Sequence, residues 1–136
     1  MSNFQGYLLK FGGSIFPHEY LDMDACTSTP NQRTEADAWT DANNLLHRET
    51  YSKYRTKEEY QTIDDLSLEE KIEIQNVMRS GLLNEKERKY QVTYWNEETN
   101  NYTTGEFYVP DTEFKRKRIE NGTIYYGPIR IALIEY

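Results

Sequence analysis

The sequence has very little of the residue types that build disulfides, metal sites and catalytic centres. It contains one cysteine, Cys26, and two histidines, His18 and His47, among 136 residues. A lone cysteine cannot form an intramolecular disulfide, which is typical of proteins made in a reducing cytoplasm. Two isolated histidines form no compact zinc-ligand pattern, and Gly12–Gly13 lacks the Lys and Ser/Thr of a phosphate loop. The sequence therefore predicts no catalytic residues, no cofactor and no metal site.

Three groups of side chains give weaker hints of chemistry, and each has a simpler explanation. His18 and His47 could form a metal-binding or proton-transfer pair, but two ordinary surface histidines are the favoured interpretation. Cys26 lacks the flanking signature of a nucleophile, which favours a buried or loop thiol. Asp22 and Asp24 are two residues apart, a spacing that could place both carboxylates in one calcium or glycosidase site. The favoured interpretation is that both lie on one solvated face of a strand.

The chain also lacks a long apolar run and an excess of positive charge. No stretch approaches the length of a membrane helix, and residues 1–6 show no signal-peptide pattern. The formal net charge of −7 disfavours nucleic acid and anionic membrane surfaces as partners. Only 37% of the residues are hydrophobic, yet 12 Tyr, 5 Phe and 2 Trp argue against disorder. Such aromatics suit strands and protein–protein interfaces.

The last third of the sequence gives the clearest structural prediction. Residues 90–95 and 102–109 place aromatic and β-branched residues at alternate positions around a polar turn, which predicts an antiparallel hairpin. Asn121–Gly122 predicts a second hairpin within residues 113–126, because both turn positions favour positive φ. Residues 129–136 form an apolar strand that we expect to be tied into a sheet.

The first quarter of the sequence predicts short strands and a loop. We expect strands at residues 6–11 and 20–25, the second because apolar and polar residues alternate there. Residues 26–34, which are rich in Ser, Thr, Pro and Asn, are expected to form a mobile loop. A second mobile loop is expected within residues 110–126.

Residues 35–63 allow two interpretations. A helix could begin near Ala36, or two strands could be joined by an Asn-rich turn, and strands are favoured. One face of the final strand lacks aliphatic side chains and carries Tyr54, Thr56, Glu58, Tyr60 and Thr62. We therefore expect that face to be solvated or to lie against another subunit.

Ser67–Ser80 predicts one α-helix that covers a sheet. Ser67 and Glu70 have the spacing of a capping box, and apolar residues follow at helical spacing. Gly81 suits a left-handed residue after the last turn. Taken together, the elements predict a mainly β (α+β) fold: one antiparallel β-sandwich or barrel-like domain over residues 1–136, with one flanking helix.

Lys115–Arg118 is the one dense positive run. It could contact nucleic acid phosphates, but a strand would divide its four side chains between two faces. In an acidic protein, we favour a solvated hairpin or one that meets an acidic surface on a neighbouring copy.

Parts of the chain resemble a known group of proteins. The strand Tyr90–Trp95, the run Thr104–Val109 and the closing Leu133–Tyr136 resemble small, uncharacterised tail proteins of long-tailed phages and prophages of Gram-positive bacteria. Asn43–Glu49 and Leu66–Glu70 are compatible with that resemblance. The order of strands, one helix, hairpin and last strand is also similar to the tail-tube superfamily, in which a β-sandwich flanked by one helix forms rings, usually sixfold, around a channel.

The resemblance implies a non-enzymatic virion tail protein, made in the host bacterial cytoplasm. The expected partners are its own copies, in a sixfold ring, and other tail proteins of the tail tube, tail tip or baseplate. The residues that we expect at the contacts are aromatics and cations of the C-terminal third: Trp95, Tyr102, Tyr108, Lys115, Arg116, Lys117, Arg118, Tyr125 and Tyr126.

Two other functions are compatible with the sequence. A small β-sandwich binding module could recognise cell-surface carbohydrate or a host receptor, with Trp39, Trp95 and nearby Tyr stacked on sugars. A carboxylate-based hydrolase is the least favoured of the three.

Overall fold

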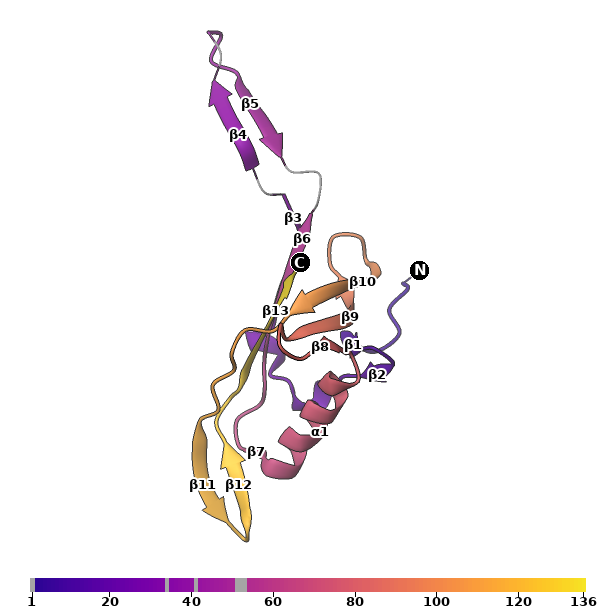
Figure 1. Ribbon diagram of the computed structural model, residues 1–136, viewed down its shortest axis with the longest axis vertical. Helices are drawn as coiled ribbons and strands as arrows, with labels where there is room; N and C mark the ends of the chain where they lie inside the picture. The colour runs from indigo at the N-terminus through magenta and orange to yellow at the C-terminus, as the bar shows by residue number, and fades with distance from the viewer. Residues whose placement is uncertain (1, 34, 41, 51–53) are drawn as a thin grey trace.

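The computed structural model describes residues 2–33, 35–40, 42–50 and 54–136 (Figure 1). This part of the chain is mostly antiparallel β-strand with one α-helix, so the predicted fold class is confirmed. The elements in chain order are β1 (Leu9–Phe11), β2 (Ser14–Ile15), the 3-10 helices η1 (His18–Tyr20) and η2 (Met23–Ala25), β3 (Thr27–Gln32), β4 (Glu35–Thr40), β5 (Leu46–Thr50), β6 (Arg55–Gln61), β7 (Leu66–Ser67), α1 (Leu68–Arg79), β8 (Leu82–Asn84), β9 (Lys89–Asn96), β10 (Asn101–Tyr108), β11 (Arg116–Glu120), β12 (Thr123–Tyr126) and β13 (Arg130–Glu135).

One antiparallel sheet of eight strands forms the body. Its order is β2-β1-β9-β10-β13-β6-β3, and β8 also pairs with β9. The predicted long hairpin is confirmed, because β9 and β10 pair without a register shift from Trp95 opposite Tyr102 to Lys89 opposite Tyr108. The closing apolar strand is also in the sheet, as expected: β13 lies between β10 and β6.

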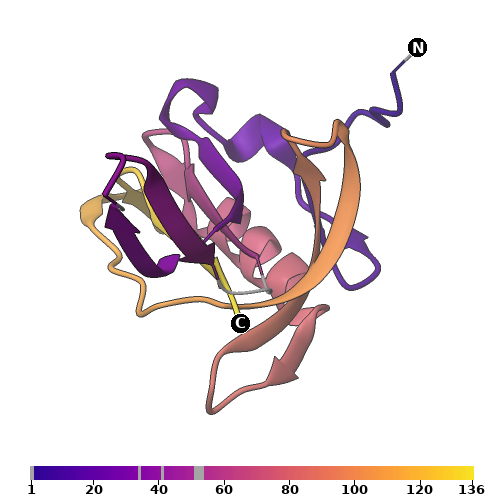
Figure 2. The same cartoon turned by 90° about the horizontal axis from the view of Figure 1, so that it is seen from above.

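The core lies on the inner face of this sheet, which Figure 2 shows as a curved wall rather than a flat layer. Alternate residues of β9, such as Val92 and Tyr94, are buried, as period-two burial requires. Tyr94 contacts Phe107 of β10 edge to face, with ring centroids 5.4 Å apart. The other large, fully buried apolar side chains are Leu9, Phe11, Phe16, Leu66, Val109 and Leu133.

The helix α1 begins and ends within one residue of its predicted bounds. Its capping box is formed: Glu70 N donates to Ser67 Oγ at 3.2 Å, and Ser67 N donates to Glu70 Oε1 at 3.0 Å. These two bonds satisfy backbone donors that have no partner inside the helix. Ile74 is the buried residue of α1 and places the helix against the core.

The expected left-handed conformation of Gly81 is wrong. The left-handed residue at this junction is Gly12, with φ +58°. Gly81 is instead required for space, because a Cβ atom on it would lie 2.6 Å from Gln91 O and 2.9 Å from Gly12 N. The end of α1 therefore lies directly against the backbone of β1 and β9.

Two expectations for the first quarter of the chain are also wrong. Residues 20–25 are not a strand: they include the end of η1 and the whole of η2, and Leu21 makes only an isolated bridge with Thr62. Residues 27–32 are not a loop but the strand β3, which pairs with β6. That pairing uses backbone groups of β6 that would otherwise be left at the edge of the sheet.

The strand interpretation is confirmed for the described part of residues 35–63, since β4 pairs with β5 and β6 joins the main sheet. Asp41 of the expected turn and residues 51–53 of the expected strands lie outside the described residues. The expected position of the inner face of β6 is wrong. Thr56, Glu58 and Tyr60 are buried inside the chain's own sheet rather than solvated or held against another subunit. Curvature of the sheet turns this face toward β9.

Two hairpins project from opposite ends of the body (Figure 1). One is β4–β5. The other is β11–β12, whose turn residues Asn121 and Gly122 have φ of +53° and +77°, as the Asn-Gly signal predicts. β12 also pairs with β7, so the second hairpin is anchored directly before α1.

The junction between α1 and the sheet can be tested with matched glycine substitutions. Gly81→Ala should lower the free energy of unfolding by about 2 kcal/mol, because the new methyl group has no space beside Gln91 O. Gly13→Ala is the control, since nothing lies within 4 Å of its Cβ position, and it should change stability by less than about 0.5 kcal/mol. Urea denaturation of both variants measures the difference. Equal stability of the two would contradict the close approach.

Candidate functional site

The structure does not bring the sequence-predicted chemical candidates together. Among the described residues, no three metal-ligating side chains form a group. His18, Asp22 and Asp24 are exposed, and the side chain of His47 lies outside the described part of the structure. Within that same part, no helix is both long and apolar enough to cross a membrane.

Cys26 is half-buried at the start of β3. Its thiol donates a hydrogen bond to Asp22 O at 3.3 Å, and burial raises the pKa of the thiol. A raised pKa reduces the thiolate fraction, and the thiolate is the nucleophilic form. The geometry therefore favours the structural interpretation of Cys26.

A pocket of about 240 Å³ opens where the curved sheet does not close. One wall comes from β3 and β6, and the other comes from the end of β9 and from Leu8. We call it the seam pocket; it is lined by Leu8, Cys26, Thr27, Ser28, Glu58, Tyr60, Trp95 and Glu97. Thr27 and Glu97 are exposed, whereas Glu58 and Tyr60 are buried. Glu97 therefore lies toward the mouth of the pocket and Glu58 lies deeper.

Polar contacts bridge the two walls next to the seam pocket. Asn96 Nδ2 donates to Asn31 Oδ1 at 3.3 Å. Arg33 forms a two-point contact with Glu98, with N–O distances of 2.9 and 2.8 Å. Deeper inside the curved sheet, the hydroxyls of Thr56 and Tyr94 are 2.8 Å apart and join β6 to β9. These contacts hold the walls together on one side of the pocket.

Glu58 is the buried ionisable group of this pocket and is 1% exposed. The Tyr60 hydroxyl donates to Glu58 Oε1 at 3.3 Å, but Glu58 Oε2 has no hydrogen-bond partner in the described structure. Burial raises the pKa of Glu58 to about 7, and the negative charge of Glu97 adds to the increase. Desolvation penalises the charged form of a carboxyl group, which explains the direction.

The other three buried polar residues, Thr56, Thr62 and Asn96, each have hydrogen-bond partners. Thr56 Oγ1 accepts from Asn31 N, and Thr62 Oγ1 accepts from Ile129 N. Asn96 Oδ1 accepts from two backbone N–H groups of the following turn. Native proteins rarely leave buried polar atoms without partners, so an exception calls for an explanation. The sequence did not predict the burial of Glu58. The alternation of Glu58 with Thr56 and Tyr60 indicates a strand, but it does not show which face of the strand points into the core.

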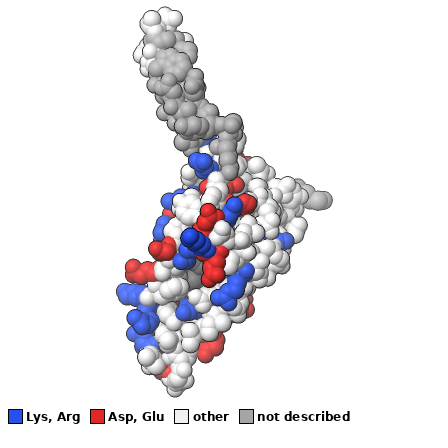
Figure 3. All heavy atoms as spheres, viewed as in Figure 1, with Lys and Arg blue, Asp and Glu red and all other residues white. Residues whose placement is uncertain are grey.

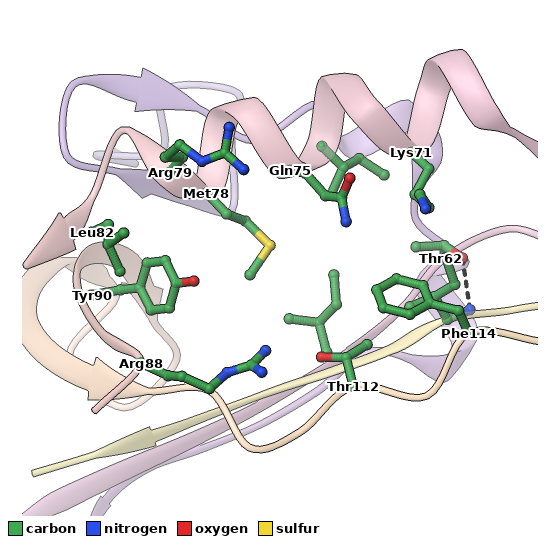
Figure 4. Close-up of a pocket in the computed structure, with 13 residues that line it drawn as sticks. Thr62, Lys71, Gln75, Met78, Arg79, Leu82, Arg88, Tyr90, Thr112 and Phe114 are labelled. Carbon is green, nitrogen blue, oxygen red and sulfur yellow. Dashed lines mark hydrogen bonds between the residues drawn. The ribbon is translucent and has the colours of Figure 1, made fainter. Parts of the chain in front are cut away.

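A second pocket, of about 160 Å³, lies between α1 and the sheet (Figure 4). Lys71, Gln75 and Met78 of α1 face Arg88 and Phe114 across it. The lining also includes Thr62, Ile74, Arg79, Leu82, Tyr90, Thr112, Ile129 and Ile131, so apolar residues make up much of its wall. No nucleophile paired with a base is among these residues.

The cations of this second pocket have few acidic partners. Arg88 Nε is buried without a hydrogen-bond partner, and its Nη1 lies 3.5 Å from the exposed Asp111. Lys71 Nζ lies 4.9 and 4.7 Å from the ring centroids of Phe114 and Tyr126. Positive charge above an apolar wall suits a small anionic group with an apolar body.

The predicted contact residues Trp95 and Tyr102 are covered in part by the N-terminal segment of the same chain. Phe4 packs edge-on against the Trp95 ring at 5.2 Å, and Tyr7 stacks on Tyr102 at 4.6 Å. The Tyr102 hydroxyl accepts from Gln5 N at 2.9 Å and donates to Tyr7 O at 2.8 Å. Much of this aromatic surface is thus used within the chain.

The remaining predicted aromatics differ in accessibility. Tyr108 is exposed beside Tyr136, with ring centroids 5.6 Å apart. Tyr125 is half-buried under the Arg118 guanidinium, 4.3 Å from its ring centroid. Tyr126 is only 4% exposed and belongs to the core, so we do not retain it as a contact residue.

The four predicted cations divide into two pairs. Lys117 Nζ lies 3.1 Å from Asp64, and Arg118 forms a two-point contact with Asp65. Lys115 and Arg116 are exposed, and neither makes an ion pair with any described residue. Figure 3 shows Lys and Arg side chains gathered along the β11–β12 side of the molecule.

Comparison with known proteins places the chain in a family and relates its fold to a solved assembly. The whole chain, residues 1–136, matches the family described as a family of unknown function (DUF6711), and it belongs to that family. No curated protein sequence matches it. A similar solved structure is a chain described as "Tail of empty GTA particle computed with helical refinement, C6 symmetry". The two chains are 9% identical with a TM-score of 0.54, over 100% of this chain and 95% of the other. At this identity, the likeness shows a shared fold.

The burial of Glu58 predicts a pH dependence of stability. Its folded pKa of about 7 is above the ordinary value of 4.5, so the folded protein retains a proton that the unfolded chain loses. The stability contributed by Glu58 is therefore present below pH 4.5, falls as the pH rises to 7, and stays low above it. Glu58→Gln should remove this dependence and make the protein more stable than wild type at pH 8, by about 2 kcal/mol.

Urea denaturation at pH 5 and pH 8 measures this effect, and the difference between variant and wild type isolates Glu58 from other carboxylates. Glu85→Gln, in the exposed turn before β9, is the control and should show no such difference. A Glu58→Gln effect that is equal at both pH values would contradict the raised pKa.

Proposed function

We propose that the protein is a structural, non-enzymatic tail protein of a bacteriophage virion, and that its copies form a ring in the tail tube, tail tip or baseplate. The observation that carries this proposal is the likeness of the whole fold to a chain of a GTA particle tail. The C6 symmetry stated for that tail supports a sixfold ring as the form of assembly. The sequence resemblance to tail proteins supports long-tailed phages and prophages of Gram-positive bacteria as the origin.

The surface of the molecule supports assembly. Each projecting hairpin carries an exposed aliphatic side chain near its turn: Leu46 of β5 is 65% exposed, and Ile119 of β11 is 80% exposed. Among the described strands, β3 pairs only with β6 and so leaves one sheet edge open. Open edges and projecting apolar side chains favour association with further chains. In this proposal, the protein is made in the host cytoplasm and ends in the virion tail beside other tail proteins.

The contacts between copies would use the hairpins and the accessible aromatics. Of the predicted contact residues, Tyr108, Tyr125 and the cations Lys115–Arg118 are retained in this proposal, together with Trp95 and Tyr102 where Phe4 and Tyr7 leave them uncovered. A carbohydrate-binding module is less well supported, because Phe4 and Tyr102 both pack against the Trp95 ring. The side chain of Trp39 lies outside the described part of the structure.

Assembly can be measured directly. We expect the purified protein to form ring-shaped oligomers, detected by size-exclusion chromatography with light scattering and by electron microscopy. Mass spectrometry of virions from a phage that encodes the protein should detect it in the particle. A protein that stays monomeric at high concentration and is absent from virions would overturn the proposal.

The projecting hairpin can be tested with a single substitution. Ile119→Asp should weaken self-association by at least about tenfold, because it places a charge where we expect an apolar contact. Leu83→Asp is the matched control: Leu83 is also exposed, but it lies on β8 rather than on a projecting hairpin. Sedimentation velocity compares the two variants. An equal effect of both, or no effect of either, would count against a contact at this hairpin.

A further inference from the structure

We infer that the seam pocket receives the Lys115–Arg116 pair of a second copy of this chain, with Glu58 as the carboxylate that binds the incoming cation. This inference rests on the proposed self-assembly and identifies one contact within it. It links a buried carboxyl group that has no cationic partner among the described residues to two cations that make no ion pair with any described residue.

The pocket is built to accept a positively charged group. Glu58 Oε2 is buried without a hydrogen bond of good geometry to any described residue, and the hydroxyls of Ser28 and Tyr60, which lower the pKa of Glu58, offset the effect of burial only in part. Glu97 lies toward the mouth and adds a second negative charge. A volume of about 240 Å³ exceeds the volume of a water molecule several times over and leaves space for an ammonium or guanidinium group. Among the described residues, no positively charged side chain lines the pocket.

The distribution of charge over the described residues identifies the cations that would enter the pocket. In the run 115–118, Lys117 and Arg118 are already paired with Asp64 and Asp65. Lys115 and Arg116 form the one adjacent pair of exposed, unpaired cations in the described structure. They lie at the base of a hairpin that projects from the body (Figure 1). An isolated positive patch on a chain of net charge −7 is attracted to negative surfaces of other copies.

The contact must form between copies. The pocket lies between β3, β6 and β9, whereas the hairpin is anchored by β7 on the side where α1 begins. Two different surfaces then meet, so each copy offers one pocket and one hairpin. Such a heterologous contact gives a closed ring when the rotation between copies closes, and a filament when it does not.

The contact should depend on pH. The free protein holds Glu58 with a pKa of about 7, whereas a cation beside it favours the carboxylate. The described groups around Glu58 are Tyr60 on its own strand, Cys26 directly before β3, Ser28 on β3, Tyr94 on β9 and Glu97 directly after β9. None of them supplies a positive charge. Formation of the contact therefore releases the Glu58 proton. The association constant of one contact should rise about tenfold between pH 6 and pH 8.

A mixing experiment at pH 8 with the full chain tests the inference. One variant, Glu58→Gln, loses the acceptor and keeps the hairpin; the other, Lys115→Glu with Arg116→Glu, loses the donor and keeps the pocket. Each alone should need at least about tenfold more protein to assemble than wild type. An equal mixture should form dimers that do not grow, because the intact hairpin of the first variant enters the intact pocket of the second. Light scattering and sedimentation velocity measure the species.

Control variants and the wild type separate the possible failures. Glu85→Gln and Lys86→Glu change exposed charges elsewhere and should assemble as wild type does. Circular dichroism establishes that each variant is folded. Glu97→Gln provides a second, milder change at the pocket. If the wild type assembles and both test variants assemble equally well with no pH dependence, this contact is wrong and the proposed function stands. If the wild type does not assemble at any pH, both proposals fail.

Discussion

The pairing of β13 with both β10 and β6 is the contact on which the rest of the structure depends. On one side of β13 lie β2, β1, β9 and β10, and on the other lie β6 and β3. These two groups share no other ladder within the described residues, so only this strand makes them one sheet. Once they are joined, right-handed twist curves the sheet and brings the inner face of β6 opposite β9. The Thr56–Tyr94 contact and the seam pocket both follow from that curvature.

The inner face of β6 is polar, which is unusual for a strand that lines a small core. Thr56 and Thr62 are acceptable there because backbone N–H groups bind their hydroxyls. Glu58 is different, since one of its oxygens has no donor and its ionisation is opposed by burial. Retaining such a residue where a hydrophobic one would fit suggests a role outside the isolated chain. A charge that is costly in the monomer becomes favourable when a partner supplies the opposite charge, which makes association specific as well as stable.

Local signals in the sequence were sufficient to predict some elements of the structure but not others. The Asn121–Gly122 turn, the capping box at Ser67 and the alternation in β9 and β10 each depend on a few neighbouring residues, and all are confirmed. The strand β3 was missed because its Ser, Thr, Pro and Asn composition favours a loop, while pairing with β6 decides otherwise. The burial of Glu58 and Tyr126 depends on how distant strands meet, which no local pattern contains.

The place of β13 also affects how the chain folds as it is made. Its partner β6 is completed about seventy residues earlier in synthesis, so the ladder between them must close a long loop. Until residues 130–135 leave the ribosome, the edges of β6 and β10 that β13 will occupy stay unpaired. Completion of the sheet therefore follows synthesis of most of residues 1–136, and a nascent chain with those edges exposed is a natural substrate for chaperones.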